Sequence, residues 1–190
     1  TAGSGDRTRG LSQLAETIPG GHVLEIGSGP GWDADTPEEA GLTVRRTDVT
    51  QAFIELQRAR GKQVDRLDVI YDELGGPYDG VVALHVLQHI EPDDLPGVLT
   101  KVAGALRPGG YFLVSIPRGE GAVWQVEESG TSYFRALWTE AEFTAALARA
   151  GVAAGDVDYI HPHGTASRQN DAVEAMLVAR LFPPAVHASS

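Results

Sequence analysis

Residues 23–32 read VLEIGSGPGW, and this stretch decides the fold of the 190-residue chain. Its apolar residues and single carboxylate predict a short buried strand, which ends in glycines at alternate positions, Gly27, Gly29 and Gly31. Because glycine has no Cβ, it adopts positive φ and lets a ligand lie against the bare backbone. A buried strand that enters such a turn before a helix is typical of phosphate or nucleoside sites in open α/β sheets. By itself the loop is equally compatible with a plain strand-to-helix turn.

The fixed residues of this loop resemble motif I of the class I S-adenosylmethionine (SAM) dependent methyltransferases, whose pattern is acid-x-Gly-x-Gly-x-Gly. Glu25, Gly27, Gly29 and Gly31 match every fixed position. The resemblance implies that the methionine end of SAM lies against the backbone of the loop, which includes Ser28. It also implies that Glu25 meets the ammonium group of SAM, directly or through a water molecule.

A nicotinamide-binding fingerprint is the competing interpretation of the same loop. When the fingerprint is read from the first glycine, its third position falls on Trp32, which is too large for close packing of helix on strand. Reading it from the second glycine to Ala34 restores a Gly-x-Gly-x-x-Ala form, so the loop alone does not exclude NAD. Glu25 favours SAM, because a carboxylate attracts an ammonium group and repels a pyrophosphate.

Asp48 ends the next predicted strand, residues 42–47. It lies about 20 residues past the first glycine, where a nucleoside ribose lies in this type of fold. A carboxylate accepts hydrogen bonds from two vicinal hydroxyls, and each such bond contributes roughly 1.5–3 kcal/mol. A turn or helix-capping role is the alternative for this aspartate. The resemblance implies that Asp48 binds the ribose of SAM and that Val49 lies beside the cofactor.

The third strand has a blurred pattern over residues 64–70. The resemblance implies that an acid after this strand lies near the adenine amino group, with an apolar neighbour on the face of the ring. Asp68 and Val69 are the residues that we assign to these positions. Asp65 is the rival for the acid, and a surface aspartate in a loop is the alternative for either one.

An apolar run from Val81 to Leu84 predicts a strand buried on both faces. His85 and His89 follow, four residues apart, and we expect them at the start of a helix and on one face of it. Residues 77–90 resemble the fourth strand and the following helix of the methyltransferase family, where a Leu-x-His element is common, which implies that Leu84 and His85 lie next to the cofactor. Because the pKa of imidazole is close to working pH, His85 and His89 are the candidate general bases. A structural imidazole that donates to the backbone is the alternative for His89, and zinc is disfavoured because no third ligand is near.

Residues 106–110 read LRPGG before an apolar strand at 111–117, which also resembles the family and predicts a helix stop with a glycine turn. Residues 157–160 and 172–181 predict two late strands joined by a loop, and hence an antiparallel hairpin. The expected fold class is α/β, a Rossmann-like three-layer sandwich. Its seven-stranded sheet is mostly parallel and ends in the C-terminal antiparallel hairpin.

The segments that connect these strands have weaker patterns. The helix after the glycine loop is expected to begin near residues 33–36, with Pro37 in its first turn and an aspartate or a threonine as N-cap. Residues 118–139 show little periodicity, and we expect loops that carry the acceptor, because loops beyond the carboxyl ends of strands bind substrates in this architecture. Thr139 and Glu142 then fit a capping box that begins a helix.

The formal net charge of -11 argues against a nucleic-acid partner, since phosphate binding needs a basic face. No apolar run is long enough to predict a membrane span, and the absence of cysteine fits the cytoplasm. We expect one domain over residues 1–190, with flexible ends at 1–10 and 183–190. The resemblance implies transfer of the SAM methyl group to a small-molecule acceptor by in-line displacement, without a metal. An NAD(P)-dependent oxidoreductase and a non-catalytic SAM-binding protein are the alternatives.

Overall fold

The structure is a computed structural model, and it describes all residues except 1, 127–129, 131, 153–156, 161–173 and 181–190. The helices are α1 (Ala2–Thr17), α2 (Trp32–Glu39), α3 (Gln51–Ala59), α4 (Leu95–Ala105) and α5 (Glu140–Arg149), with one short 3-10 helix, η1 (Leu87–His89). The strands are β1 (His22–Ile26), β2 (Thr43–Asp48), β3 (Val64–Arg66), β4 (Tyr78–Ala83), β5 (Leu106–Pro117), β6 (Ala122–Val126), β7 (Ser132–Ala136), β8 (Val157–Ile160) and β9 (Glu174–Arg180).

Seven of these strands form one sheet in the order β3-β2-β1-β4-β5-β9-β8. Strands β1 to β5 are parallel, whereas β9 is antiparallel to β5 and β8 is antiparallel to β9. The chain moves outward from β1 to β3 and then returns to the other side of β1 with β4. Such a reversal of strand order opens a crevice at the carboxyl ends of the strands. The expected fold class and the terminal hairpin are therefore confirmed, while the loop expected within that hairpin lies outside the described residues.

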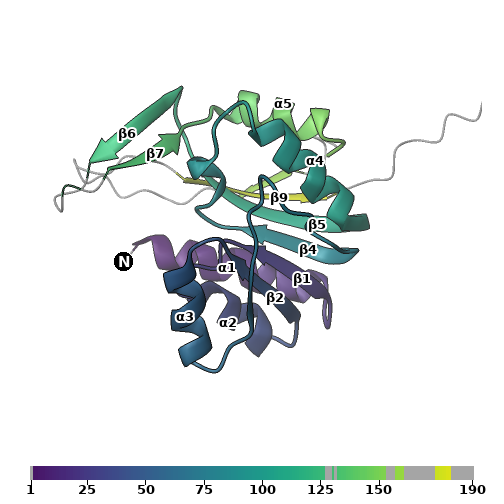
Figure 1. The fold of residues 1–190 in the computed structure, drawn as a ribbon. Coiled ribbons are helices and arrows are strands. Elements are labelled where there is room, and N and C mark those ends of the chain that lie inside the picture. The colour runs from purple at the N-terminus through teal and green to yellow at the C-terminus, as the bar shows by residue number, and fades with distance from the viewer. Residues whose placement is uncertain (1, 127–129, 131, 153–156, 161–173, 181–190) are drawn as a thin grey trace, which may run out of the picture.

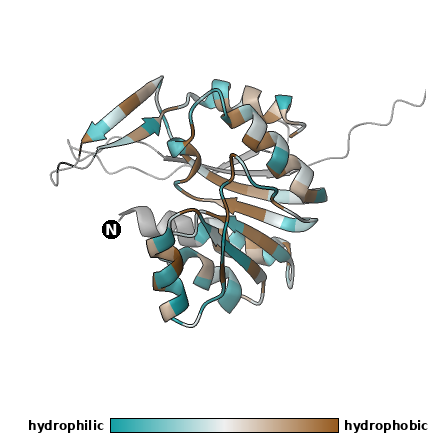
Figure 2. Ribbon diagram, viewed as in Figure 1, coloured by the Kyte–Doolittle hydropathy of each residue, from teal (hydrophilic) through white to brown (hydrophobic). Residues whose placement is uncertain are grey.

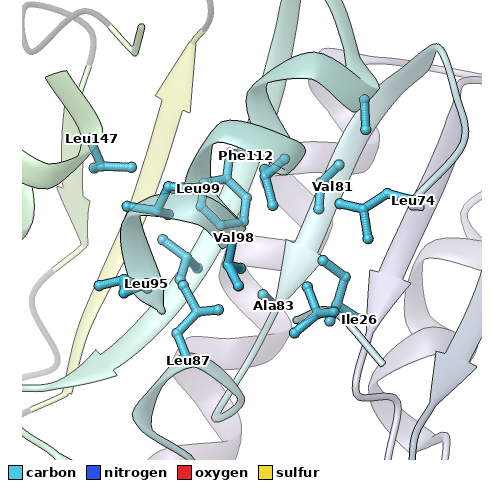
Figure 3. Close-up of a cluster of buried hydrophobic side chains, with 14 of the residues drawn as sticks. Ile26, Leu74, Val81, Ala83, Leu87, Leu95, Val98, Leu99, Phe112 and Leu147 are labelled. Atoms are coloured by element: carbon cyan, nitrogen blue, oxygen red, sulfur yellow. The ribbon is translucent and has the colours of Figure 1, made fainter. Parts of the chain in front are cut away.

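Alternate residues of the central strands enter two separate cores, one on each face of the sheet. Leu24, Val81 and Phe112 pack in the core that α4 and α5 cover, and Figure 3 shows the last two of them. Their neighbours Val23 and Val82 pack in the other core, with side chains of α1. Successive side chains of a strand point to opposite faces, so a strand covered on both sides has to be apolar throughout.

The helices complete a three-layer sandwich around the sheet. Helices α1, α2 and α3 gather on one side of it and α4 and α5 on the other (Figure 1). Figure 2 shows that hydrophobic residues concentrate in the central strands of the sheet and that polar residues are frequent in α2 and α3. None of the helices in the described parts of the chain is long and apolar enough to cross a membrane.

Helix α1 begins earlier than the sequence predicted. Residues 2–10 are helical, whereas the sequence predicted a flexible arm at 1–10. Leu11 and Leu14 are buried and fix the first core-facing turn. Extension of an existing helix fixes one residue per hydrogen bond, and no proline interrupts residues 2–10, so the helix propagates toward the N-terminus. The other expected flexible end, 183–190, lies outside the described residues.

Helix α2 also differs from the expectation. Gly31 occupies the N-cap without a side-chain hydrogen bond, and the helix begins at Trp32, so no aspartate or threonine caps it. Pro37 consequently lies in the second turn and not in the first. The physical reason is that Asp35, a candidate cap, makes ion pairs with cations outside the helix, among them Arg46.

Two connecting segments carry more strand than the sequence predicted. Helix α4 ends at Ala105 and β5 begins directly, so residues 107–110 lie in an irregular part of β5, where the register with β4 shifts. Residues 118–139 contain the β6–β7 hairpin, which projects away from the main sheet in Figure 1. Both of its strands carry β-branched or aromatic residues, which favour strands, but its mixed polarity hides the period. The capping box of Thr139 and Glu142 is confirmed at the start of α5.

Candidate functional site

Four adjacent strands bring the predicted cofactor residues to one edge of the sheet. Glu25 lies near the end of β1, and Asp48 ends β2. Asp68 follows β3 and His85 follows β4, in each case by two residues. Strands β3, β2, β1 and β4 are neighbours in that order and are parallel, so they end at the same edge. This is the edge at which open α/β sheets bind their ligands.

Side chains from β2 and the α3 region hold the backbone of the glycine loop. Three consecutive loop carbonyls each accept one hydrogen bond: Gly29 O from Gln57 Nε2 (2.9 Å), Pro30 O from Arg60 Nη1 (2.9 Å) and Gly31 O from Arg46 Nη1 (2.8 Å). Ser28 N donates to Thr47 O at 2.8 Å. The conformation of the loop is therefore fixed by the protein itself, and a ligand does not have to order it.

Asp48 closes the loop from the side of β2. Its Oδ2 accepts from Gly29 N and its Oδ1 accepts from Thr50 N, both at 2.7 Å. Asp48 is 5% exposed, so the carboxylate is a structural clamp between the loop and the start of α3. A carboxylate has about four lone-pair sites, so roughly two remain after these bonds. The turn role and the ribose role considered from the sequence are thus compatible in one residue.

The three positions of the loop favour glycine for different physical reasons. All three have positive φ: 68° at Gly27, 54° at Gly29 and 83° at Gly31. A Cβ at Gly27 would overlap the Val86 side chain, and one at Gly31 would overlap that of Gln57. A Cβ at Gly29 would meet nothing within 4 Å. Gly27 and Gly31 therefore serve packing within the protein, and only Gly29 presents backbone to open space.

Glu25 is a buried carboxyl whose pKa is raised to about 7. Burial is the main cause, because desolvation penalises the charged form. The Ser28 hydroxyl and the charge of Arg46 lower the pKa but do not outweigh burial. Glu25 Oε2 is buried and has no hydrogen-bond partner. A cation placed beside this oxygen would supply the missing partner and favour the ionised form.

The residues predicted for adenine divide into accessible and buried ones. Asp68 is half-buried in a turn after β3, where its Oδ1 accepts from Ile70 N at 3.0 Å. Its rival Asp65 lies within β3 and pairs with Arg45 at 2.8 Å. Val69 is buried in the main core, whereas Val49 is 47% exposed. Of the two predicted apolar neighbours, Val49 is therefore the one that offers surface to a ligand.

His85 lies at the end of β4 in an unusual backbone conformation. Its φ of 59° is the only positive value among the non-glycine residues that the structure describes. Its backbone N–H donates to Ser115 Oγ at 2.9 Å, and the preceding Leu84 is buried in the core beneath α1. Such strained positions cluster at functional sites, so the φ value supports a role for this segment in ligand binding.

His85 and His89 do not share one face of a helix, which corrects the expectation. The 3-10 helix η1 covers only residues 87–89, because the positive φ of His85 and the extended conformation of Ile90 interrupt helical geometry on both sides. His89 Nδ1 donates to Phe134 O of β7 at 3.0 Å, and its Nε2 lies 3.1 Å from Gln88 Nε2. A carbonyl only accepts, so the proton is on Nδ1 and the lone pair is on Nε2.

Arg46 is the site residue that sequence reasoning missed. This guanidinium is buried at 2% exposure and pairs with Asp35 (2.6 Å) and Glu38 (2.7 Å) of α2. Lys62 contacts the same two carboxylates. Burial raises the pKa of Asp35, but hydrogen bonds from Arg46 and Lys62 hold it well below its usual range. A charged residue inside a strand that is covered on both faces is the signal that would have identified Arg46.

Two methyltransferases and a polyketide synthase are among the curated proteins that resemble parts of the chain. A ubiquinone biosynthesis O-methyltransferase of Bordetella avium is 27% identical over 117 residues, which are 57% of this chain and 48% of that protein. A probable S-adenosylmethionine-dependent methyltransferase of Mycolicibacterium smegmatis is 35% identical over 108 residues, 55% of this chain and 41% of that protein. A highly reducing polyketide synthase of Alternaria alternata is 32% identical over 120 residues, 55% of this chain and 5% of that protein. The chain spans about half the length of the first of these relatives, and less of the other two.

A solved structure shows the same fold. The 1,6-didemethyltoxoflavin-N1-methyltransferase of Burkholderia thailandensis, with bound 1,6-didemethyltoxoflavin and S-adenosylhomocysteine, aligns with a TM-score of 0.70. The alignment covers 94% of this chain and 79% of that chain at 22% identity.

Two family models match the sequence, and their matches overlap. The C-terminal domain of beta-ketoacyl synthases matches residues 127–189, part of which lies outside the described residues. The methyltransferase domain matches residues 6–153, which include β1 to β7 and the whole carboxyl edge described above. Because this second match covers most of the chain and contains every predicted site residue, the chain belongs to the class I SAM-dependent methyltransferases.

Proposed function

We propose that the chain binds SAM at the carboxyl edge of β1 to β4 and transfers its methyl group to a small-molecule acceptor. The observation that carries the proposal is the glycine loop, whose three carbonyls are held by side chains while Gly29 stays open to a ligand. Membership of the methyltransferase family supports it. The nicotinamide interpretation loses its support, because the last two strands are antiparallel and not a further parallel strand.

The residues at this edge fit the parts of SAM. The backbone at Gly29 would receive the methionine end, and the unpartnered Glu25 Oε2 would accept from its ammonium group. The remaining lone pairs of Asp48 suit the ribose hydroxyls. Asp68 would accept from the adenine amino group, and the exposed Val49 would contact the ring.

Bound SAM supplies an electrophilic methyl group and a neutral leaving group. The chain itself contributes mainly alignment, which offsets roughly 7–11 kcal/mol of a bimolecular barrier when the geometry is right. A base is needed only when the nucleophile is a hydroxyl or a protonated amine. We assign that role to His89, with His85 as the second candidate. The lone pair on His89 Nε2 would exchange its hydrogen bond from Gln88 for one from the nucleophile.

Isothermal titration of the full chain with SAM, S-adenosylhomocysteine and NAD(P) tests the cofactor. Binding of the first two and not of NAD(P) is expected, and the reverse would overturn the proposal. Incubation with methyl-labelled SAM and a panel of hydroxy, amino and β-keto compounds then tests transfer. SAM binding without label transfer to any of them would favour the non-catalytic alternative.

A second candidate acceptor is favoured by two independent matches. Residues 127–189 resemble a beta-ketoacyl synthase domain, and part of the chain resembles a segment of a polyketide synthase. Both point to a β-ketoacyl thioester, in which the carbon between the ketone and the thioester carbonyl is acidic and, after loss of its proton, nucleophilic. The acceptor panel should therefore include S-acetoacetyl-N-acetylcysteamine, with mass spectrometry to locate the added methyl group. Transfer to this thioester alone would replace the first candidate by the second.

The extent of the domain is also a proposal. We infer one domain over residues 1–190, because β9 pairs with β5 along seven residues and β8 pairs with β9. A chain that ends at residue 153 would leave the edge of β5 unpaired. Limited proteolysis of the full chain that releases a stable, SAM-binding fragment without residues 154–190 would contradict this inference.

A further inference from the structure

The β6–β7 hairpin and η1 form a cluster of polar side chains beside the proposed SAM edge. We call Gln88, His89, Gln125, Tyr133 and Arg135 the hairpin–η1 cluster. The rings of His89 and Tyr133 meet edge to face with centroids 5.9 Å apart, and Tyr133 Oη donates to Gln125 Oε1 at 2.7 Å. Arg135 Nη1 donates to the same Gln125 oxygen at 3.4 Å. Tyr133 and Arg135 are two apart on β7, so both point to the hairpin face that meets η1.

Arg135 has an unused edge within this cluster. Among the residues that the structure describes, Arg135 makes one hydrogen bond, which Nη1 donates. No carboxylate of these residues forms an ion pair with Arg135. Its Nε is buried without any partner. An unsatisfied buried donor on a charged group is expensive, so such a group is usually paired. The Nε–Nη2 edge of a guanidinium matches the two oxygens of a carboxylate, which it binds with two parallel hydrogen bonds.

Gln88 adds a second unsatisfied group of opposite character. It is 8% exposed, and its Oε1 is buried without a partner while its Nε2 donates to His89. The cluster thus holds an unused cationic donor edge on β7 and an unused acceptor on η1. A ligand that satisfies both has an anionic group and a hydroxyl or an amine.

We propose that the methyl acceptor is a small organic carboxylate that also carries a hydroxyl or amine, with its carboxylate on the Nε–Nη2 edge of Arg135. This rests on the proposed function, because it concerns the acceptor of the same site. Gln88 Oε1, next to His89, accepts a hydrogen bond from the hydroxyl or amine of this carboxylate. The η1 helix begins four residues after the end of β4, so this places the nucleophile of the acceptor toward the carboxyl edge of the sheet.

Matched pairs of acids and esters test the proposal in the full chain saturated with S-adenosylhomocysteine. The probes are 3,4-dihydroxybenzoate and 4-aminobenzoate, each beside its methyl ester, and 4-hydroxyphenylphosphonate. Calorimetry should show each acid binding roughly tenfold to a hundredfold more tightly than its ester, the range of charged hydrogen bonds. The Nε–H resonance of Arg135 in nitrogen-proton spectra should shift with the acids only. Tighter binding of the phosphonate than of the acids would overturn the assignment to carboxylates.

Variants at Arg135 separate its role from folding. Arg135→Gln should abolish the preference for acids, and Arg135→Lys should retain part of it, since it keeps the charge but loses the two-pronged geometry. Arg149→Gln removes the same charge from the exposed last turn of α5 and should leave the preference unchanged. Esters that bind as well as acids to the wild-type chain, or an acid preference that survives in Arg135→Gln, overturn the proposal. If the wild-type chain does not bind S-adenosylhomocysteine, the proposed function itself is refuted.

Discussion

The glycine loop and the hairpin–η1 cluster differ in how fully their polar groups are satisfied. In the loop, three carbonyls and both oxygens of Asp48 have partners within the protein. In the cluster, Arg135 Nε and Gln88 Oε1 have none. Glu25 Oε2 beside the loop also lacks a partner, so the contrast concerns the loop backbone and Asp48, which are built into the stability of the fold. The proposed acceptor side contributes less to stability and keeps its polar groups for a ligand.

The two regions should therefore respond differently to substitution. Changes in the cluster should reduce turnover more than stability, whereas changes around the loop should reduce stability and cofactor binding together. Each experiment below breaks or sharpens this contrast.

His89→Ala should give the largest effect, a fall in turnover of roughly 10²–10⁴ if the imidazole is the general base. His22→Ala is the matched control, because His22 lies at the opposite end of β1. Steady-state kinetics with labelled SAM measures the ratio, and circular dichroism checks folding. Full activity of a folded His89→Ala chain would end the base hypothesis.

Arg46→Met should destabilise the fold by about 3 kcal/mol, the lower end of the range for breaking a buried ion pair. The lower end applies because Asp35 and Glu38 retain Lys62. Arg107→Met removes an equal charge from a pair with Asp79 that is half-exposed on the arginine side, and should change stability by less than about 1 kcal/mol. Urea unfolding measures both, and equal losses would contradict the special role of Arg46.

Gly31→Ala should lower the free energy of unfolding by about 2–3 kcal/mol, because the new Cβ disfavours positive φ and overlaps the Gln57 side chain. Gly41→Ala isolates the backbone part, because Gly41 has a φ of 90° but open space around its Cβ position, and should cost about 1 kcal/mol. Gly29→Ala also has open space, so it should weaken SAM binding more than stability. Urea unfolding measures stability and calorimetry measures SAM binding. Identical unfolding curves for the three variants would refute the separate roles given to these glycines.

Affinity for SAM should rise with pH through about 7, the pKa of Glu25. Below that pH the folded protein holds a proton that an ammonium group must displace, so affinity should fall about tenfold per unit. Linkage also requires that the free protein loses stability as pH rises from 5 to 8, because the folded pKa is above the unfolded one. Calorimetry between pH 6 and 8 tests the sign. Glu25→Gln should remove the slope, and an unchanged slope would exclude Glu25 as its source.

The sequence predicted the parallel sheet and its carboxyl edge from local patterns. Residues 81–83 of β4 are predicted correctly because both faces of the sheet are covered, which makes the segment apolar throughout, whereas Leu84 lies just past the end of the strand. Asp48 was placed correctly because the spacing from the glycine loop reflects one strand-helix-strand unit. The hairpin in residues 118–139 was missed because its strands have no clean alternation between a buried and a solvent face.

Local pattern by itself determined the parallel strands, the glycine loop and the carboxylates at the strand ends, since each depends on neighbours within a few residues. Only the tertiary structure decided that Arg46, Gln57 and Arg60 hold the three loop carbonyls, and that His89 is tied to Phe134 of β7. These contacts join residues 15 to 45 positions apart. No periodicity in the sequence records such pairs, because they form only when separate elements pack side by side.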